Sequence, residues 1–272
     1  MQVFFSKYLL FYVRTLTNRI NTANIAGMTE ITTDDFLGGK IHMMQPLNGL
    51  RATSDSVLVA AAVPVQTGDT VLDVGCGGGI IPCCISTRAD HLDITGFEIQ
   101  DELLRLATEN AHRHGICFRP VLGNVADKPS PIHGRQFHHV VSNPPFYTET
   151  KHRTCPQTAT AYHQKVSLAD WIAFCLRHIR AKGTLTLIHR TQELPTLLSL
   201  LNGKLGAIDI IPVHGHIQES AGRIIVRGRL DSHRPLRLYP PLTMHTATNT
   251  RTQVAEHLLR NGMGLDEILK TT

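Results

Sequence analysis

Short apolar runs alternate with longer amphipathic ones along this chain, which predicts an α/β fold with a doubly wound, mostly parallel sheet. The connections between the runs are short, as expected where helices link neighbouring parallel strands. The last two strand-like runs have no full helix between them, which predicts an antiparallel pair at one edge. At 272 residues with 42% hydrophobic content, the chain can form a single large domain with a substantial core.

Helices and strands alternate regularly in the first half of the chain. A hydroxyl at Thr53 or Ser54 can cap a helix that extends to about Val63. The run Asp101–His114 repeats leucine and alanine on one helical face, which predicts an amphipathic helix. A further helix is expected from Ile80 to about Arg88, and strands are expected at Thr70–Val74, His91–Phe97, Phe118–Leu122 and His138–Ser142.

The second half completes a predicted sheet of seven strands, one of them an antiparallel edge strand. One helix holds the single tryptophan, Trp171, and another follows the next strand. These helices are expected from Ser167 to about Arg180 and at Gln192–Asn202, with strands at Thr184–His189, Ala207–His214 and Arg223–Leu230.

Residues 1–27 differ from the rest of the chain. They contain Lys7, Arg14 and Arg19 but no acidic residue, and their apolar run is interrupted by Lys7. The segment is too short and too interrupted to span a bilayer, and it lacks a clear cleavage site. It is an amphipathic targeting or membrane-touching segment, a disordered tail, or an upstream translation of a protein that starts at Met28. We favour the last, so residues 28–272 are expected to form one domain.

Positive charge is concentrated in the second half. Residues 1–150 contain 11 Lys/Arg against 14 Asp/Glu, whereas residues 151–272 contain 16 against 8. A polyanion such as a nucleic acid should therefore prefer the second half, although a solvated basic surface is the alternative. The arginines near the last strand are either phosphate contacts or ordinary solvated edge residues: Arg223, Arg227, Arg229, Arg234 and Arg237.

Cysteine and histidine spacing argues against disulfides and metal ions. The 6 cysteines show no Cys-x-x-Cys pair and lie in apolar runs, which favours a reduced, cytoplasmic protein. As a separate expectation, we predict no stable membrane contact. His112 and His114 fall on different helix faces, and His138 and His139 point to opposite faces of a strand. We therefore expect no metal site.

The segment VLDVGCGGG closes the first predicted strand, where a doubly wound sheet binds its ligands. Gly75, Gly77 and Gly79 allow a tight turn and a close approach of the backbone to a ligand, although a packing turn would look similar. Glu98 ends the next strand, 21 residues after Gly77. Nucleotide-binding units place a carboxylate on the ribose hydroxyls at a spacing of about 20 residues.

The position of Asp73 indicates which nucleotide is bound. A dinucleotide-binding turn has the order Gly-x-Gly-x-x-Gly, whereas here Asp73 precedes Gly75, Gly77 and Gly79 in the order Asp-x-Gly-x-Gly-x-Gly. A carboxylate beside the turn would repel a pyrophosphate and attract an amino or sulfonium group. The sequence therefore favours S-adenosylmethionine over NAD.

A second motif, Asn143-Pro144-Pro145-Phe146, follows the fourth predicted strand. Asn143 offers a side-chain carbonyl, and the Pro144 carbonyl is held rigid because consecutive prolines have fixed φ angles. Two acceptors aimed at the hydrogens of an aromatic amine would orient it and stabilise the positive charge of methyl transfer. Phe146 can lie against the flat face of a base. The alternative is that this motif is only a rigid strand-to-loop turn without a role in binding.

Together these motifs resemble a known family. Asp-x-Gly-x-Gly-x-Gly, Glu98 and Asn-Pro-Pro-Phe are similar to those of class I, Rossmann-like S-adenosylmethionine-dependent methyltransferases, and more closely to the tRNA1(Val) (adenine-N(6))-methyltransferase family, over about Thr32 to Leu265. The resemblance implies that the glycine turn and Asp73 hold the methionine part of the cofactor and Glu98 its ribose. Asn124 would lie along the adenine, where the wider fold often has Asp.

The resemblance implies methyl transfer to the 6-amino group of an adenosine beside the anticodon of a tRNA. Because other enzymes with Asn-Pro-Pro-Phe/Tyr act on a guanine amino group in rRNA or on a protein glutamine, these substrates remain alternatives. A non-catalytic RNA-binding protein with the same fold is a further alternative, but the intact Asn143 beside an intact glycine turn speaks against it.

Overall fold

The computed structural model describes residues 30–146 and 166–271. The predictions about residues 1–27 and a start at Met28 therefore lie outside the described residues. Within these ranges every predicted strand forms, and every predicted helix forms in whole or in large part. No helix in residues 30–146 or 166–271 is long and apolar enough to cross a membrane.

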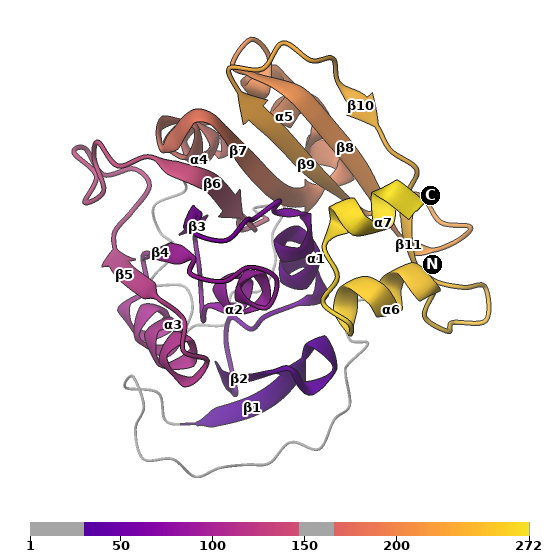
Figure 1. Cartoon of the computed structure of the whole chain (residues 1–272), viewed down its shortest axis with the longest axis horizontal. Coiled ribbons are helices and arrows are strands. Elements are labelled where there is room, and N and C mark those ends of the chain that lie inside the picture. Colours follow the sequence, from indigo (N-terminus) through magenta and orange to yellow (C-terminus); the bar gives the residue numbers. More distant parts are fainter. Residues whose placement is uncertain (1–29, 147–165, 272) are drawn as a thin grey trace, which may run out of the picture.

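The fold is a large mixed sheet with helices on both faces (Figure 1). The described strands form a nine-stranded sheet in the order β10-β8-β9-β7-β6-β3-β4-β5, with β11 also pairing with β8. The strands of this sheet are β3 (Thr70–Val74), β4 (Asp93–Glu98), β5 (Phe118–Leu122), β6 (Phe137–Ser142), β7 (Ile179–Arg190), β8 (Leu205–His216), β9 (Arg223–Leu230), β10 (Arg237–Leu238) and β11 (Leu242–His245).

The predicted fold class is confirmed, including the antiparallel pair. Strand β9 runs antiparallel to both of its neighbours, β7 and β8, whereas the other pairs in this sheet are parallel. The antiparallel strand does not form the edge, because β8 returns beyond it and β10 and β11 then pair with β8. The seven predicted strands are therefore extended by two short ones that sequence periodicity missed.

The order of the strands reverses between β3 and β6. The chain builds outwards from β3 through β4 to β5, and then returns to place β6 on the other side of β3. In the register of this pair, Asp73 lies opposite Val141. The carboxyl ends of β3 and β6, which carry the two sequence motifs, are therefore adjacent at the switch point where such sheets bind ligands.

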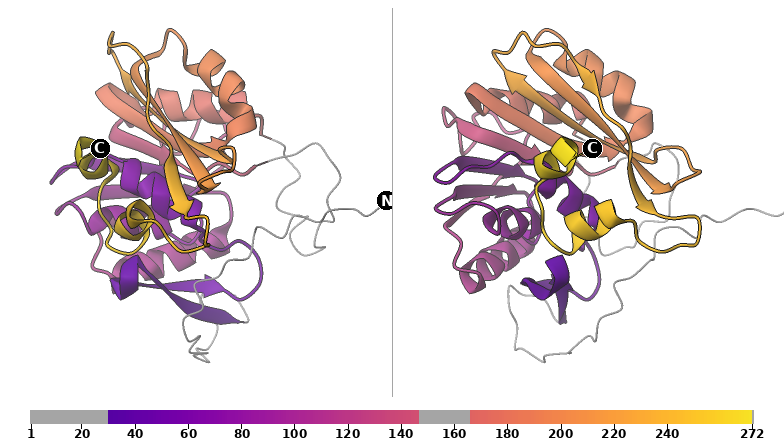
Figure 2. Two further views of the ribbon diagram at one scale, coloured as in Figure 1. Left: turned by 90° about the vertical axis from the view of Figure 1, so that its right-hand side faces the viewer. Right: turned by 45° about the vertical axis from the view of Figure 1, so that its right-hand side comes forward.

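Two hydrophobic cores cover the faces of the sheet (Figure 2). One core joins the sheet to helices α1, α2, α6 and α7, and the other joins it to α4 and α5; α3 packs beside α2. The helices are α1 (Ser54–Ala62), α2 (Ile80–Ser86), α3 (Asp101–Arg113), α4 (Leu168–Arg177), α5 (Leu194–Leu201), α6 (Gln253–Leu259) and α7 (Leu265–Thr271), with short 3-10 helices at Leu37–Gly39 and Thr191–Glu193.

The boundary between α4 and β7 differs from the prediction. The helix ends at Arg177, and β7 already begins at Ile179, inside the range predicted as helix. The reason is pairing with β6: the Phe137 amide donates to the His178 carbonyl at 2.8 Å, and Ile179 lies opposite Phe137 in the sheet. Tertiary pairing thus overrides the local helical pattern.

A separate hairpin, β1 (Ile31–Phe36) with β2 (Ile41–Pro46), was not predicted. Asn110, fully buried on α3, attaches it to the glycine turn. The Asn110 side chain accepts from the Met44 amide at 2.9 Å and donates to the Met44 carbonyl at 3.0 Å and the Gly78 carbonyl at 2.9 Å. Because one amide serves both segments, the hairpin is fixed against the turn after β3.

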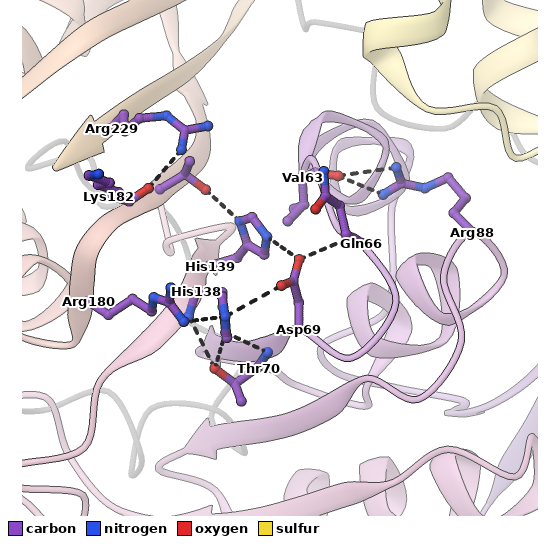
Figure 3. A network of polar contacts seen from close by, with 11 residues as sticks. Val63, Gln66, Asp69, Thr70, Arg88, His138, His139, Arg180, Lys182 and Arg229 are labelled. Carbon is purple, nitrogen blue, oxygen red and sulfur yellow. Dashed lines mark hydrogen bonds and ion pairs between the residues drawn. The ribbon is translucent and has the colours of Figure 1, made fainter. Parts of the chain in front are cut away.

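A polar network closes the amino-terminal end of the sheet (Figure 3). His139 on β6 lies between Asp69, with Nε2 2.9 Å from Oδ2, and Thr184 on β7, with Nδ1 2.8 Å from Oγ1. His138 lies 2.9 Å from the Thr70 hydroxyl through Nδ1 and 3.6 Å from Asp69 Oδ1 through Nε2. Burial lowers the pKa of His139, which favours the neutral imidazole. Among the residues that the structure describes, no group of three His, Cys, Asp or Glu is placed to hold a metal ion.

Arg227 joins four elements in the interior. It donates through Nη2 to Asp209 on β8 at 3.0 Å and to Asp266 on α7 at 2.6 Å, and through Nη1 to the Ala62 carbonyl at the end of α1 at 3.0 Å. Arg237 also pairs with Asp209, at 2.8 Å. Arg227 and Arg237 are thus engaged by carboxylates. Both line a cavity of about 390 Å³, which also includes Thr184 at the amino-terminal end of the parallel strands, away from the two motifs.

The substitution Arg227→Ala should lower the free energy of unfolding by about 3 kcal/mol, because it leaves the buried Asp209 with one partner instead of two. Urea denaturation would measure the change. The control is Arg229→Ala, which removes an exposed arginine from the same strand and should cost less than about 0.5 kcal/mol. Equal losses in the two variants would contradict a structural role for the Arg227 ion pairs.

Candidate active site

Asp73 is a buried carboxylate near the carboxyl end of β3. It is 0% exposed, and within residues 30–146 and 166–271 neither of its oxygens accepts a hydrogen bond. Burial, with a smaller contribution from the charge of Glu98, raises the pKa of Asp73 well above its usual range. An unpartnered buried carboxylate is costly, and a bound cation would relieve this cost.

The glycine turn after β3 has the geometry that its sequence predicts. Gly75, Gly77 and Gly79 all have positive φ angles, of 74°, 52° and 88°. A Cβ atom at Gly75 would lie 3.0 Å from the indole ring of Trp171, and one at Gly79 would lie 3.1 Å from Ala107 on α3. Side chains are thus disfavoured by both backbone conformation and space at Gly75 and Gly79, and by backbone conformation alone at Gly77.

Glu98 lies at the end of the neighbouring strand, β4, and bonds to the turn. Its Oε2 accepts from the Gly77 amide at 2.9 Å, and its Oε1 accepts from the amides of Ile99 at 2.9 Å and Gln100 at 3.0 Å. Burial raises the pKa of Glu98, while these backbone amides oppose the rise. The 21-residue spacing seen in the sequence therefore corresponds to a direct contact between strand end and turn.

Asn143 follows β6 on the other side of β3. Its Nδ2 donates to the Ser56 hydroxyl on α1 at 3.1 Å. Its Oδ1 is buried and accepts no hydrogen bond from any residue that the structure describes. The side-chain amide is thus held at its donor end while its acceptor end has no partner, which is the arrangement needed to receive the hydrogen of a substrate amine.

Trp171 and Ser142 connect the two motifs. The indole Nε1 donates to the Ser142 hydroxyl at 3.0 Å, and that hydroxyl donates to the Val74 carbonyl at 2.7 Å. This series of hydrogen bonds runs from α4 through β6 to β3 and fixes the ends of β6 and β3 against each other. No sequence motif placed Trp171 in the site, although a single tryptophan in the chain is a signal that could have drawn attention to it.

The rest of the proline motif lies beside the ends of β7 and β9. Pro144 is buried, and Pro145 and Phe146 are partly buried. The Phe146 ring meets His189 edge-on, with centroids 4.9 Å apart, and the guanidinium carbons of Arg223 and Arg190 lie 4.9 and 5.5 Å from its centroid. Phe146 therefore contacts cationic residues that sequence reasoning did not place near it.

Asn124 lies in the loop after β5, next to the end of β4. Its side-chain Oδ1 accepts from the Ala126 backbone amide at 3.0 Å, and its own backbone amide donates to the Asp127 carboxylate at 2.9 Å. The Gly123 amide donates to the Glu98 carbonyl at 2.9 Å. The predicted loop is thus beside Glu98, and its amide oxygen takes part in a local turn; a carbonyl oxygen can accept a second hydrogen bond.

The carboxylates and the carbonyl oxygen of this site fit S-adenosylmethionine, which carries an ammonium, a sulfonium and a ribose. Asp73 is a buried carboxylate without a partner among the described residues, as a cation site needs, and Glu98 is a carboxylate at the ribose position of nucleotide-binding sheets. The Asn143 oxygen, which also has no partner in residues 30–146 or 166–271, lies at the end of the adjacent strand. These residues come from three neighbouring strands, as the sequence motifs predict.

Known proteins are similar to this chain in sequence and fold. A relative from Actinobacillus succinogenes, named tRNA1(Val) (adenine(37)-N6)-methyltransferase, is 25% identical over 166 residues, which cover 58% of this chain and 68% of that protein. A relative of the same name from Shewanella baltica is 26% identical over 185 residues, 65% of this chain and 76% of that protein. A crystal structure of a predicted O-methyltransferase from Agrobacterium tumefaciens superposes with a TM-score of 0.62 at 23% identity, covering 76% of this chain and 96% of that one.

The family model of the methyltransferase small domain matches residues 52–211. This segment is more than half of the chain and includes Asp73, Glu98 and Asn143. The chain therefore belongs to the methyltransferase small domain family and is an S-adenosylmethionine-dependent methyltransferase.

Proposed function

We propose that this protein transfers a methyl group from S-adenosylmethionine to the exocyclic 6-amino group of an adenosine in tRNA, next to the anticodon. The observation that carries the proposal is the Asn143 amide, with its nitrogen bonded to Ser56 and its oxygen buried and unpartnered among the described residues. The relatives named tRNA1(Val) (adenine(37)-N6)-methyltransferase support the choice of RNA and base.

The ends of β3, β4 and β5 would hold the cofactor. The Asp73 carboxylate would bind the ammonium group, the turn of Gly75, Gly77 and Gly79 would hold the methionine part, and Glu98 would accept from the ribose hydroxyls. Asn124 would bind the adenine. When bound, S-adenosylmethionine supplies a methyl group activated by its positively charged sulfur.

Asn143 orients the substrate amine for in-line attack. An aromatic amine is a weak nucleophile because its lone pair is delocalised into the ring. The Asn143 oxygen and the Pro144 carbonyl accept its two hydrogens and stabilise the positive charge that develops on nitrogen. Ser56 keeps the amide in the orientation that presents the oxygen. No strong base is required, because methyl transfer leaves a neutral thioether and the methylated aromatic amine is acidic enough to release its extra proton to water.

An anticodon loop suits this arrangement energetically. A base in such a loop is unpaired, so placing it in a pocket costs less than extruding it from a duplex. Phe146 and its cationic neighbours lie beside Asn143 and can contact the base and the groups attached to it.

The direct test is incubation of the purified protein with labelled S-adenosylmethionine and unmodified total tRNA, followed by nucleoside analysis. We expect labelled N6-methyladenosine. In parallel incubations with rRNA and with protein, label in N2-methylguanosine or in glutamine without label in tRNA would replace the proposed substrate. Salt-dependent RNA binding without cofactor binding in calorimetry would indicate a non-catalytic RNA-binding protein.

Asn143 and Glu98 should affect different steps. The substitution Asn143→Ala should lower kcat by about 10²–10³ because it removes an acceptor used in the transition state, with little change in cofactor Kd. Glu98→Ala should mainly raise the cofactor Kd. Steady-state kinetics and calorimetry separate the two effects, and equal losses of cofactor affinity in both variants would contradict these roles.

Cofactor affinity should depend on the ionisation of Asp73. The pKa of Asp73 in the free protein is raised by burial and by the charge of Glu98. An ammonium group binds the ionised carboxylate, so affinity should rise with pH through that raised pKa and fall below it. Calorimetry with S-adenosylhomocysteine across pH measures the dependence.

Two variants serve as controls for this pH profile. Asp73→Asn should weaken binding and flatten the profile, whereas Asp90→Asn, which alters an exposed carboxylate, should leave it unchanged. An unaltered profile in Asp73→Asn would assign the pH dependence to another group.

A further inference from the structure

The carboxyl edge of the sheet is divided by charge. In the spatial order β4, β3, β6, β7, β9, it carries first the carboxylates of Glu98 and Asp73, then the Asn143 motif, and then the cationic groups of Arg190 and Arg223. The two halves meet at the position where the amine of the substrate is held. Anionic groups of a substrate are attracted by the cationic second half, so they are expected to lie over it.

Arg223 is held in place but keeps hydrogen-bonding capacity. Its Nε donates to Asp55 on α1 at 2.8 Å and its Nη1 donates to the Gly222 carbonyl at 3.1 Å, while its guanidinium carbon lies 4.9 Å from the Phe146 centroid. These contacts use two of the five N–H groups of a guanidinium. A fixed, partly exposed fork with unused donors suits a phosphate oxygen.

Arg190 completes the cluster from the neighbouring strand. It is partly exposed and lies 5.5 Å from the Phe146 centroid, and in the described part of the chain its side chain has no carboxylate partner. His189, beside it, is buried, its Nδ1 has no hydrogen-bond partner among the described residues, and its ring meets the same aromatic ring edge-on at 4.9 Å. Burial lowers the pKa of His189; the charge of Glu193 opposes this, and the charges of Arg190 and Arg223 each add a smaller lowering.

The other arginines of β9 do not share this position. Arg227 is buried between Asp209 and Asp266, and Arg229 lies opposite Thr184, near the amino-terminal end of the parallel strands. With about 3.3 Å per residue, the six residues from Arg223 to Arg229 span roughly 20 Å along the strand. Of these three arginines, only Arg223 is at the edge that carries Asn143.

We propose that Arg190 and Arg223, gathered around Phe146, form a binding site for the backbone phosphate adjacent to the nucleotide whose base is methylated. The inference rests on the proposed RNA substrate and deepens it: a base held at Asn143 carries its sugar and phosphates with it, and the cationic half of the edge offers the groups that bind a phosphate. A glutamine side chain carries no phosphate and would leave the two arginines without a ligand. The site therefore selects nucleotides.

The experiment measures binding of a fluorescein-labelled, unmodified anticodon stem-loop RNA by anisotropy over a range of salt concentrations. Arg190→Ala should raise Kd about tenfold at low salt, as for the loss of a charged hydrogen bond, and should reduce the slope of log Kd against log salt by about 0.7–0.9 for one lost contact. KM for RNA should rise similarly, with kcat and the cofactor Kd little changed.

Three matched variants define the contact. Arg190→Lys keeps the charge but loses the fork, so it should recover part of the affinity and the full slope. Arg223→Lys is the corresponding change on β9 that preserves charge beside Asp55. Arg229→Ala removes one positive charge from the other end of the same strand and should change Kd and slope less than Arg190→Ala. Equal effects of Arg229→Ala and Arg190→Ala would overturn the proposal, because they would indicate general surface attraction.

A neutral linkage identifies the phosphate. A methylphosphonate beside the target adenosine should weaken RNA binding by the wild-type protein and cause no further loss of affinity in Arg190→Ala. Additive losses of affinity would refute the contact. Failure of the wild type to bind the RNA would refute it as well. Methyl transfer to adenosine with unchanged binding in the variants would refute the phosphate site and leave the proposed function intact. Loss of binding in the variants without any methyl transfer by the wild type would support the phosphate site and refute the proposed function.

Discussion

Two carboxylates buried at the ends of adjacent strands are the constraint on which this site depends. Glu98 is stabilised by three backbone amides, whereas Asp73 has no partner among the described residues. Burial makes the charge of Asp73 unfavourable and raises its pKa. Such a position is tolerable where a cationic ligand completes it, and it obliges any anionic ligand to bind elsewhere.

The direction of strand β9 places positive charge at the same edge of the sheet. Because β9 runs antiparallel to its neighbours, its first residue, Arg223, lies at the edge where the parallel strands end. A parallel strand would have placed that arginine at the far end. The single reversed strand thus brings a cation next to Phe146, beside Arg190 from the end of β7.

The first turn of α1 organises the substrate side of the site. Ser56 bonds to the Asn143 amide and Asp55 bonds to Arg223. One helix end thereby fixes both the acceptor for the amine and the arginine beside the aromatic ring. The amino-terminal network of His139, Asp69 and Thr184 holds the same strands from the other end, which limits relative movement of β3, β6 and β7.

The local features of this protein could be read from the order of its residues alone. Glycines that need positive φ, prolines with fixed φ and alternating apolar runs are properties of short segments, so the turn at 75–79, the motif at 143–146 and the predicted strands could be found before the fold was known. Which distant side chains meet became known only from the folded chain. Ser56 reaches Asn143 across 87 residues and Asp55 reaches Arg223 across 168, because strand order, register and direction are settled by pairing between remote segments and leave no local pattern in the chain.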